Sequence, residues 1–452
     1  MFTRSTQLWF FILVIPYLLS CSNNWLNEKP DEFLTVPGTV ADYQALLDNV
    51  TLLNNAQPGL GEVASGDFHM SYDSWQSLFS RQERSAYIWE STDRFYGGEQ
   101  NTDWAASYKQ ILTHNIVLDG LQKLKARHAA DPEWKNVFGS ALFFRSFSLY
   151  NLSQLFCKGY NDETADREPG LPLRLSADVD AHIGRSTLRQ TYHQITGDLK
   201  QAIPYLGTSQ KVKTRPSKQA AYALLARVYL SLEDYEQAGA YADSALQIQH
   251  GLLNYATLKA GSYPLPRFNE EVIFHASTTY GAFNASRLLV DPDLLGQYDE
   301  ADLRRTLFFV SARNGFTFRG SYSGDKNLFC GLATDEMYLI RSECYARAGR
   351  YKDAIADLNL LLKSRWRSAH REIRVDDDAV LPLILKERRK ELVFRCLRWS
   401  DLRRLNRDER FATTLVRTMN NTTYRLLPND KRYVFPIDEE EIRLSGIAQN
   451  DR

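Results

Sequence analysis

Apolar residues recur at helical spacing over most of the chain. The clearest stretch is residues 220–248, where Ala221, Leu224 and Val228 fall on one face of a helix. A short polar break at residues 233–234 separates this face from a second apolar face. The pattern predicts two antiparallel helices, with small residues where the helices approach each other closely.

A second helix pair is predicted at residues 337–365, where the same order of residue types recurs. Both pairs resemble tetratricopeptide repeats (TPRs). The copies are not in tandem, so a simple solenoid is not predicted. The matching positions are Ala226, Tyr229, Tyr235, Ala238 and Ala245 in the first pair, and Ser342, Tyr345, Tyr351, Ala354 and Leu361 in the second.

Further helices are predicted at residues 104–124, 140–156, 187–206 and 383–405. Residues 140–156 are apolar on nearly every side, which indicates a deeply buried helix. The helical period is lost in two tracts, residues 53–102 and 252–334, which are rich in Gly, Pro, Asn and aromatic residues. The segment EVIFHAS at residues 271–277 could form short strands. We therefore predict a mainly α fold with two loop-rich tracts.

Residues 1–20 have the pattern of a secretory signal peptide. A single charge, Arg4, precedes an apolar run at residues 8–19, which is shorter than the roughly 20 apolar residues that a membrane span needs. The residues before Cys21 (Leu-Leu-Ser) resemble the lipobox of bacterial lipoproteins, in which this cysteine is lipidated and becomes the mature N-terminus. We expect residues 21–452 to be the mature chain, forming a single domain. The alternative is an ordinary apolar segment with an incidental cysteine.

Charge and cysteine content exclude some classes of function. Lys+Arg and Asp+Glu are both 55, so the chain carries no basic footprint for nucleic acid. No CxxC or metal-ligand spacing is present, and we expect neither a metal nor a cofactor. An exported protein could form a disulfide, although the spacing identifies none. Beyond Cys21 the cysteines are Cys157, Cys330, Cys344 and Cys396, of which the last two fall in helical patterns and are expected to be small buried hydrophobes.

No catalytic motif was found. The sequence lacks GxSxG, HExxH and a phosphate-binding glycine loop, and no pair of carboxylates stands in a recognisable glycosidase setting. Four histidines occur singly, which is more typical of surface or hydrogen-bonded residues than of ligands. These are His69, His114, His193 and His275. A glycan hydrolase remains the less favoured alternative to a binding protein.

A series of motifs, in order along the chain, resembles the SusD/RagB family of nutrient-binding lipoproteins of Bacteroidetes. The resemblance extends from Cys21 to the C-terminus. The residues that carry it are Ala141, Arg145, Phe147, Tyr150, Leu152 and Phe156; Gly170 to Leu173; Arg185, Tyr192, Ile195, Asp198, Leu199 and Ala202; Ser217, Lys218 and Leu225 to Leu230; Tyr338 to Arg341 and Glu343; Glu387, Arg388, Glu391, Leu392, Arg398, Trp399 and Asp401 to Arg404; and Pro436, Ile437, Glu441, Ile442, Gln449 and Asn450.

The chain departs from the family pattern at two places. The family usually has Glu-Gly before its Arg-Trp-Asp-Leu element, where this chain has Arg395-Cys396 followed by Leu397. The family's Asn-Pro near the end is replaced by Ser445-Gly446. The chain is also short for the family, and the shortening falls in the tract 252–334.

The resemblance implies a non-catalytic protein, lipid-anchored in the outer membrane through Cys21 and facing the cell exterior. It would act as the lid of a SusC-like TonB-dependent transporter, capturing an oligosaccharide or peptide, with a glycan favoured. A third hypothesis is a structural or assembly lipoprotein that binds another protein through its TPR-like surfaces.

A glycan site needs rigid aromatic rings for the apolar faces of sugars and polar groups for the hydroxyls. We expect such residues in the two loop-rich tracts. The alternative is that each aromatic ring packs a loop onto the helices. The principal candidates are Tyr72, Trp75, Trp89, Tyr96, Phe316 and Tyr322, with Tyr263, Phe268, Tyr280 and Phe318 as further aromatics and Asp67, Arg81, Asp93 and Asn101 as polar neighbours.

Charged residues inside the predicted helices are expected to form structural ion pairs rather than to do chemistry. These are Arg145, Arg227, Glu387, Arg388, Asp401 and Arg404.

Overall fold

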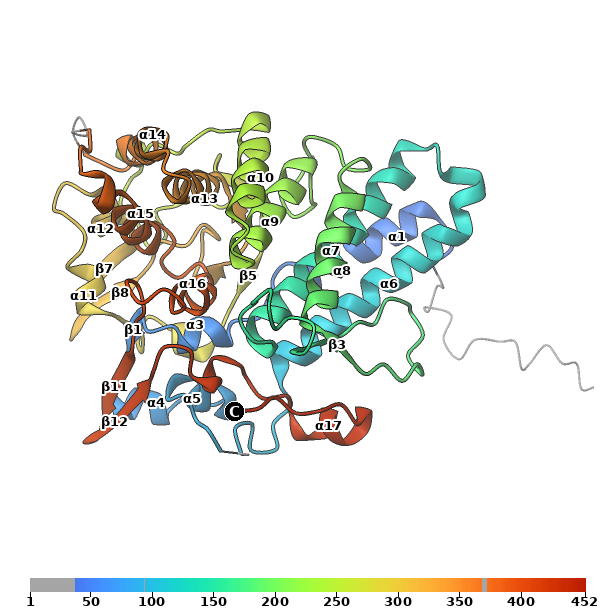
Figure 1. Ribbon diagram of the computed structural model, residues 1–452, viewed down its shortest axis with the longest axis horizontal. Coiled ribbons are helices and arrows are strands. Elements are labelled where there is room, and N and C mark those ends of the chain that lie inside the picture. The colour runs from blue at the N-terminus through green and yellow to red at the C-terminus, as the bar shows by residue number, and fades with distance from the viewer. Residues whose placement is uncertain (1–36, 93, 368–371) are drawn as a thin grey trace, which may run out of the picture. The chain divides into compact units, whose positions relative to one another are not determined.

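The structure, a computed structural model, describes residues 37–92, 94–367 and 372–452. Residues 39–452 form one compact unit. Within the described residues, seventeen α-helices dominate, and the strands pair only two at a time (Figure 1). The predicted mainly α fold is confirmed. The predicted signal peptide and Cys21 lie outside the described residues.

The helices are α1 (Val40–Leu47), α2 (Val50–Leu53), α3 (Leu60–Ala64), α4 (Tyr72–Gln76), α5 (Arg81–Tyr87), α6 (Thr102–His128), α7 (Pro132–Phe156), α8 (Leu188–Ala202), α9 (Lys218–Ser231), α10 (Tyr235–Ile248), α11 (Pro292–Leu295), α12 (Leu303–Phe308), α13 (Thr334–Arg347), α14 (Tyr351–Lys363), α15 (Asp377–Glu391), α16 (Arg398–Leu405) and α17 (Glu439–Ser445). None of these helices combines the length and the apolar character that a membrane span requires.

The strands form six antiparallel pairs. They are β1 (Phe68–His69) with β6 (Leu289–Val290), β2 (Pro169–Pro172) with β3 (Arg185–Thr187), β4 (Val272–Phe274) with β10 (Leu332–Ala333), β5 (Ser277–Thr278) with β9 (Leu328–Phe329), β7 (Phe309–Ala312) with β8 (Gly315–Phe318), and β11 (Leu415–Met419) with β12 (Thr422–Leu426). The short strands expected in EVIFHAS are β4 and the start of β5.

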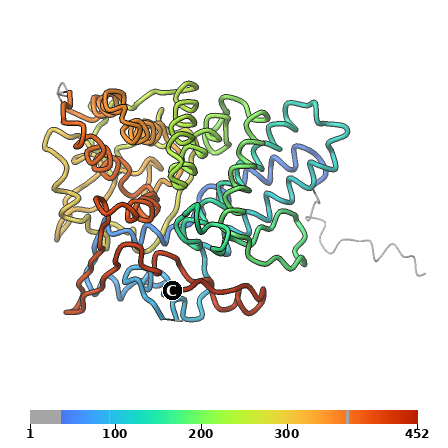
Figure 2. The backbone as a smooth tube through the Cα atoms, viewed as in Figure 1, coloured from blue at the N-terminus to red at the C-terminus, as the bar shows by residue number. Residues whose placement is uncertain are grey.

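The long helices pack on one another in sequence order. Helix α6 packs on α7, α7 on α8, α8 on α9 and α9 on α10, and α10 continues to α13 and α13 to α14 and α15. Figure 2 shows this succession as the tube passes from cyan through green to orange. Each helix buries an apolar stripe against its neighbours, which is how amphipathic helices remove apolar area from water.

Helix α7 is buried along most of its length, as its uniformly apolar sequence predicts. Small residues let its neighbours come close. A Cβ added at Gly139 would lie 2.9 Å from the Cβ of Tyr205 and 3.1 Å from the carbonyl oxygen of Ala202, near the end of α8. A larger residue at position 139 would therefore push α8 and the segment after it away from α7.

The two TPR-like pairs are α9–α10 and α13–α14, and they lie against each other through α10 and α13. The second loop-rich tract, residues 252–334, connects the two pairs. Its two ends are joined directly, because the Thr334 hydroxyl donates to the Gln249 side-chain oxygen at 3.1 Å.

The predicted helix at residues 383–405 is wrong in its continuity. Helix α15 ends at Glu391 and α16 begins at Arg398. Between them Phe394 and Cys396 have φ angles of 55° and 58°, in the left-handed region, so the backbone turns out of the helix. The apolar residues of this break have the spacing expected of a helix. Their side chains nevertheless pack into the core from an irregular turn. Cys396 is accordingly half-buried in a loop, whereas Cys344 is buried in α13 as predicted.

The expected structural ion pairs are confirmed. The guanidinium of Arg145 on α7 pairs with Asp198 on α8 at 2.7 Å, and both side chains are almost fully buried. The other pairs join α9 to α13 (Arg227 with Glu336), α15 to α12 (Glu387 with Arg304), α15 to α16 (Arg388 with Asp401) and α16 to α13 (Arg404 with Glu343).

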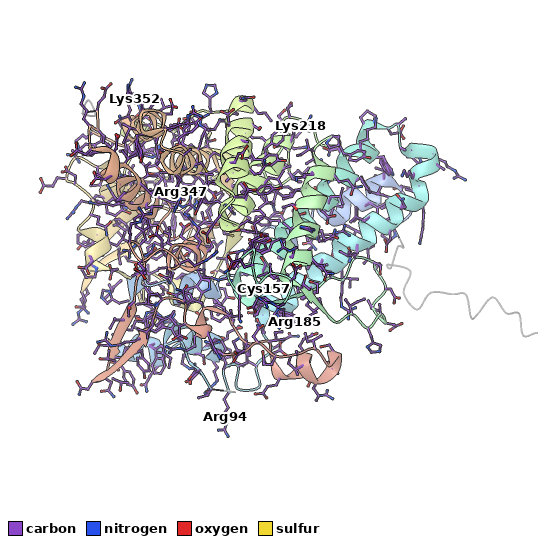
Figure 3. All side chains as sticks on the ribbon, in the orientation of Figure 1. Arg94, Cys157, Arg185, Lys218, Arg347 and Lys352 are labelled. Atoms are coloured by element: carbon purple, nitrogen blue, oxygen red, sulfur yellow. The ribbon has the colours of Figure 1, made fainter. Side chains whose placement is uncertain are left out.

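The C-terminal segment returns to the helical scaffold through Arg185, labelled in Figure 3. Its guanidinium donates to the Gly170 carbonyl at 2.8 Å and to the Asn450 side-chain oxygen at 2.7 Å. Asn450 in turn donates to the carbonyl oxygens of Phe156 and Phe435. One half-buried arginine therefore fixes the β2–β3 pair, the end of α7 and the end of the chain together.

Candidate functional site

A large cavity lies where the two loop-rich tracts meet. Its volume is about 1330 Å³, and it is lined by parts of the segments 55–57, 79–83, 99–106, 262–263, 278–285 and 310–326. A site for a drug-sized molecule usually measures about 300–1,000 Å³. The cavity is therefore large enough for an oligomeric ligand.

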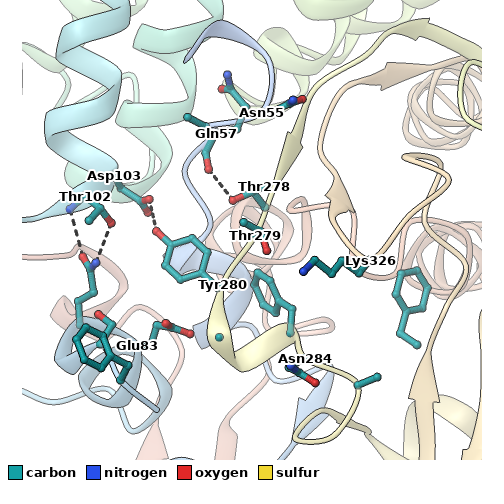
Figure 4. Close-up of a pocket in the computed structure, with 18 of the residues that line it drawn as sticks. Asn55, Gln57, Glu83, Thr102, Asp103, Thr278, Thr279, Tyr280, Asn284 and Lys326 are labelled. Carbon is teal, nitrogen blue, oxygen red and sulfur yellow. Dashed lines mark hydrogen bonds between the residues drawn. The ribbon is translucent and has the colours of Figure 1, made fainter. Parts of the chain in front are cut away.

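One wall is built around Asp103, in the first turn of α6. One oxygen of its carboxylate accepts the backbone N–H groups of Gly59 and Leu60, both at 3.1 Å. The other oxygen accepts the hydroxyl of Tyr280, an interaction drawn in Figure 4. Burial raises the pKa of Asp103 to about 6, and the three hydrogen bonds act in the opposite direction.

Gly59 is required for this wall. A Cβ at position 59 would lie 2.6 Å from the ring of Tyr280, closer than Cβ atoms come to other heavy atoms. The glycine lets the backbone approach the tyrosine ring closely. Its N–H group can then reach Asp103 while Tyr280 donates to the same carboxylate.

A second carboxylate, Glu83 on α5, is held from the opposite tract. It accepts the backbone N–H of Ala282 at 2.6 Å. Burial raises the pKa of Glu83, while its hydrogen bonds with the backbone at Ala282 and Gly281 lower it. Beside it, Gln82 donates to the Thr102 hydroxyl at 2.7 Å. These bonds connect α5, the start of α6 and the segment 278–285 into one rigid surface.

Phe79 stands at the edge of the cavity with its side chain 99% exposed. The loop beneath it is fixed, because Leu78 is buried and the guanidinium of Arg84 donates to the carbonyl oxygens of both Leu78 and Phe79. The carboxylate of Glu99 accepts the N–H of Arg81 at 2.9 Å on the other side of this loop. An aromatic ring is thus held in water on an ordered backbone. Tyr263, 44% exposed, adds a second ring from the other tract.

The cavity also offers polar groups that are not used by the protein itself. Gln100, Thr279 and Lys326 are exposed, and the structure gives their side chains no hydrogen-bond partner within the described ranges. Figure 4 shows the amine of Lys326 directed toward Thr279. These groups can donate to, or accept from, hydroxyl and carbonyl groups of a ligand.

None of the six principal candidates from the sequence lines this cavity. Trp89, Tyr96 and Tyr322 are buried, so the expected exposure does not hold for them. Each ring also has a polar partner inside the protein. The indole N–H of Trp89 donates to Ala64, the Tyr96 hydroxyl donates to Pro436, and the Tyr322 hydroxyl donates to Glu271.

The other three principal candidates are half-buried. Tyr72 and Trp75 lie ring to ring with centroids 5.7 Å apart, and the Trp75 indole donates to the Arg84 carbonyl at 3.0 Å. They therefore support the helix that holds the Phe79 loop. Phe316 lies on β8 and packs against the core.

Most of the further aromatic candidates lie at the cavity. Tyr263, Tyr280 and Phe318 line the cavity, whereas Phe268 does not. Of the polar neighbours, Asp67 pairs with Arg389, Arg81 donates to the Arg94 carbonyl, and Asn101 caps α6. Asp93 lies outside the described residues. Sequence reasoning missed Phe79, which directly follows Leu78 in the stretch QSLFSRQ and has no motif that marks it as exposed.

An acidic cluster elsewhere has the spacing of a metal site. Glu271, Asp335 and Glu391 are buried and bring one carboxylate oxygen each within 4.8 Å of the others. Arginines already neutralise this cluster, because Arg365 pairs with Glu271 and Glu391 and Arg395 pairs with Asp335. The arrangement is that of a buried ion-pair network.

Fold and site together define a class of protein: a helical scaffold that presents a loop-built, aromatic-rimmed cavity. Comparison with protein families gives the particular family. Residues 24–230 match a family model described as "Starch-binding associating with outer membrane", and residues 334–451 match the model of the SusD family. The chain belongs to the SusD family.

Solved structures share the fold. A SusD superfamily protein from Bacteroides thetaiotaomicron has a TM-score of 0.74 and 22% identity, and the match covers 92% of this chain and 100% of that one. A putative sugar binding protein from Bacteroides vulgatus also has a TM-score of 0.74, with 19% identity over 92% of this chain and 99% of that one.

Curated relatives match over shorter lengths. SusD-like protein P2 of Formosa agariphila is 26% identical over 241 residues, which is 50% of this chain and 43% of that protein. The catalytic subunit pan2 of the PAN2-PAN3 deadenylation complex of Emericella nidulans is 26% identical over 190 residues, which is 42% of this chain and 15% of that protein. The chain thus spans less than half the length of these curated relatives.

Proposed function

We propose that the protein binds an oligomeric nutrient, most simply a glycan, in the cavity between its two loop-rich tracts, without catalysis. The observation that carries this proposal is the exposed ring of Phe79 on an anchored loop at the edge of a polar cavity of about 1330 Å³. An aromatic ring held in water is available to stack on the apolar face of a sugar, and unpaired amide, hydroxyl and amine groups nearby suit sugar hydroxyls.

Binding rather than hydrolysis is supported by the state of the carboxylates. Asp103 and Glu83 accept hydrogen bonds from backbone amides, and Asp103 also accepts one from Tyr280. A catalytic carboxylate, whether general acid or nucleophile, must be free to contact the bond that is cleaved. Groups engaged in this way act as fixed walls, and they shape the cavity.

The wider role follows the family. We infer lipid anchoring at Cys21, exposure at the cell surface and delivery of the captured nutrient to a TonB-dependent transporter in the outer membrane. The family description, with its outer-membrane association, supports this inference. The sugar-binding name of one structural neighbour supports the choice of a glycan.

The test is to measure binding of the full chain to a panel of soluble oligosaccharides and peptides by calorimetry. Removal of a well-placed aromatic contact commonly costs more than about 1 kcal/mol, so Phe79→Ala and Tyr263→Ala should each weaken glycan affinity by about fivefold or more. Phe268→Ala is the matched control, because Phe268 is an exposed phenylalanine of the same tract as Tyr263 that does not line the cavity.

Equal affinity of Phe79→Ala, Tyr263→Ala and Phe268→Ala for the same glycan would show that the cavity is not the binding site. Binding of peptides alone would replace the glycan by a peptide ligand. Release of shortened products from a bound glycan would overturn the non-catalytic role.

A further inference from the structure

Two cysteines that are distant in sequence line one small cavity of about 40 Å³. Cys330 follows β9, and its backbone N–H donates to the Ala276 carbonyl at 2.9 Å. Cys396 lies in the turn between α15 and α16. Interaction with the Cys330 side chain is the largest cause of the raised pKa of the Cys396 thiol, and burial adds to it, as expected for two thiols that line the same small cavity.

The backbone at Cys396 provides a second observation. Its φ of 58° is a conformation that glycine adopts freely and that residues with a side chain adopt rarely. This is also the position at which the chain has Arg395-Cys396 in place of the Glu-Gly usual in the family. The cysteine therefore occupies a strained position, and a covalent partner would offset that strain.

The remaining cysteines of the described ranges do not share this arrangement. Cys157 is buried beside Arg185 and Arg403, and Cys344 is buried in α13 against Gly239 of α10. For both, burial raises the pKa of the thiol, to about 11 for Cys157 and about 12 for Cys344. The pKa of the Cys396 thiol is raised as well, so proximity to a second cysteine, and not acidity, distinguishes Cys330 and Cys396.

We propose that Cys330 and Cys396 form a disulfide when the exported chain folds in an oxidising compartment. The oxidant is a disulfide donor of the thiol–disulfide oxidoreductase class. The thiolate of one cysteine attacks a donor sulfur and forms a mixed disulfide, and the second donor sulfur leaves as a thiol. The other cysteine then attacks the mixed disulfide, so that one S–S bond replaces two S–H bonds and the donor departs as a dithiol.

The disulfide would be both protected and structural. Cys330 is buried and Cys396 is half-buried, so exchange takes place before α16 closes over them or during local opening. Once formed, the bond joins the turn between β9 and β10 to the turn between α15 and α16. It closes the intervening chain into a loop, which restricts the unfolded state.

Peptide mapping tests the bond directly. The full chain, with its own leader, is exported by a Gram-negative host, and free thiols are alkylated in denaturant before digestion without reductant. We expect the peptides of Cys330 and Cys396 to be linked, two hydrogens lighter than their sum, with Cys157 and Cys344 alkylated. Alkylation of both Cys330 and Cys396 in the exported protein would overturn the proposal.

Thermal unfolding with and without reductant gives an independent test. Reduction should lower the Tm of the natural chain by about 3–6 °C. Cys396→Gly should be insensitive to reductant. Its Tm should lie below that of the oxidised chain and at or above that of the reduced chain, because glycine accepts the φ of 58°.

Cys344→Ala serves as the control, since it removes a buried thiol and should keep the full sensitivity to reductant. A natural chain whose Tm is the same in both conditions, together with a Cys396→Gly variant that is more stable than it in both, would show that the two cysteines carry no bond.

Discussion

His114 illustrates at the residue scale how burial decides the role of a side chain. The ring is fully buried in α6 and stacks on Phe144 with centroids 5.5 Å apart, and neither ring nitrogen has a hydrogen-bond partner within the described residues. Burial, aided by the nearby Arg145, lowers the pKa of His114 to about 3. The imidazole is a neutral packing group, consistent with a histidine that binds no ligand.

This histidine should make the protein sensitive to acid. Because its folded-state pKa lies below the usual 6.5, the unfolded chain binds a proton first, and stability is lost as the pH falls from about 6.5 toward 3. At about pH 5 the loss should be about 2 kcal/mol. We expect His114→Leu, which cannot bind the proton, to avoid this loss.

The measurement is denaturant unfolding of both proteins at about pH 7.5 and pH 5. The difference between the two proteins is the informative quantity, because Glu62 and Asp103 have raised pKa values and change stability in the opposite direction in both. The His114→Leu advantage should grow by about 2 kcal/mol between the two pH values. Parallel stabilities would mean that His114 titrates normally.

At the scale of elements, buried ion pairs connect helices that also pack through apolar residues. Arg227 on α9 and Glu336 on α13 form two hydrogen bonds, of 2.8 and 2.6 Å, with both side chains nearly excluded from solvent. The same guanidinium donates to the Gly331 carbonyl. The pair thus fixes α9, α13 and the turn before β10 relative to one another.

We expect Glu336→Gln to lower the free energy of unfolding by about 3 kcal/mol, because it leaves the Arg227 charge buried without a counter-ion. Chemical denaturation at neutral pH measures the effect. Asp353→Asn is the control: it removes the carboxylate of the exposed Arg350–Asp353 pair and should cause no measurable change. If the two variants lose the same free energy of unfolding, the buried ion pair does not stabilise the fold more than the exposed pair does.

The elements that could be predicted from sequence are those specified locally. The α9–α10 pair follows from its apolar spacing, and Asp234 marks the start of α10 by accepting the N–H of Gln237. The break between α15 and α16 could not be foreseen, because Phe394 and Cys396 turn the backbone where the apolar spacing continues as in a helix. That turn is selected by packing among distant segments.

The sequence predicted which two tracts form the site but only some of the residues that line it. Both loop-rich tracts contribute to the cavity, and the further candidates Tyr263, Tyr280 and Phe318 line it, whereas none of the six principal candidates does. Trp89 and Phe79 both lie in the first tract, but Trp89 is inserted beneath it and Phe79 projects from it. Their difference depends on partners such as Ala64 and Arg84, whose positions the local sequence does not specify.

At the scale of the whole molecule, ligand capture and attachment to a transporter should be separable. Phe79 is fully exposed and supports no packing, so its removal should leave the fold unchanged. We expect Phe79→Ala to bind glycan more weakly while it still co-purifies with a TonB-dependent transporter from detergent-solubilised outer membranes. Cys21→Ala should instead leave the membrane fraction.

Affinity purification followed by identification of the co-purifying proteins measures the first expectation, and cell fractionation measures the second. The absence of a transporter from the purified natural chain would contradict the delivery role. A membrane-bound Cys21→Ala variant would contradict the lipid anchor.

The hydrogen bond between Thr334 and Gln249 joins the two ends of the second loop-rich tract. A segment whose ends are held together can change greatly in length at little cost, since doubling a loop adds only about 0.6 kcal/mol of closure entropy. Natural variation can therefore lengthen or shorten the exposed loops of this segment, while buried residues such as Phe274 and Arg304 keep it packed on the helices. Diversification of nutrient specificity would then need no redesign of the scaffold, and loops grafted from a relative should be accepted where they replace exposed residues alone.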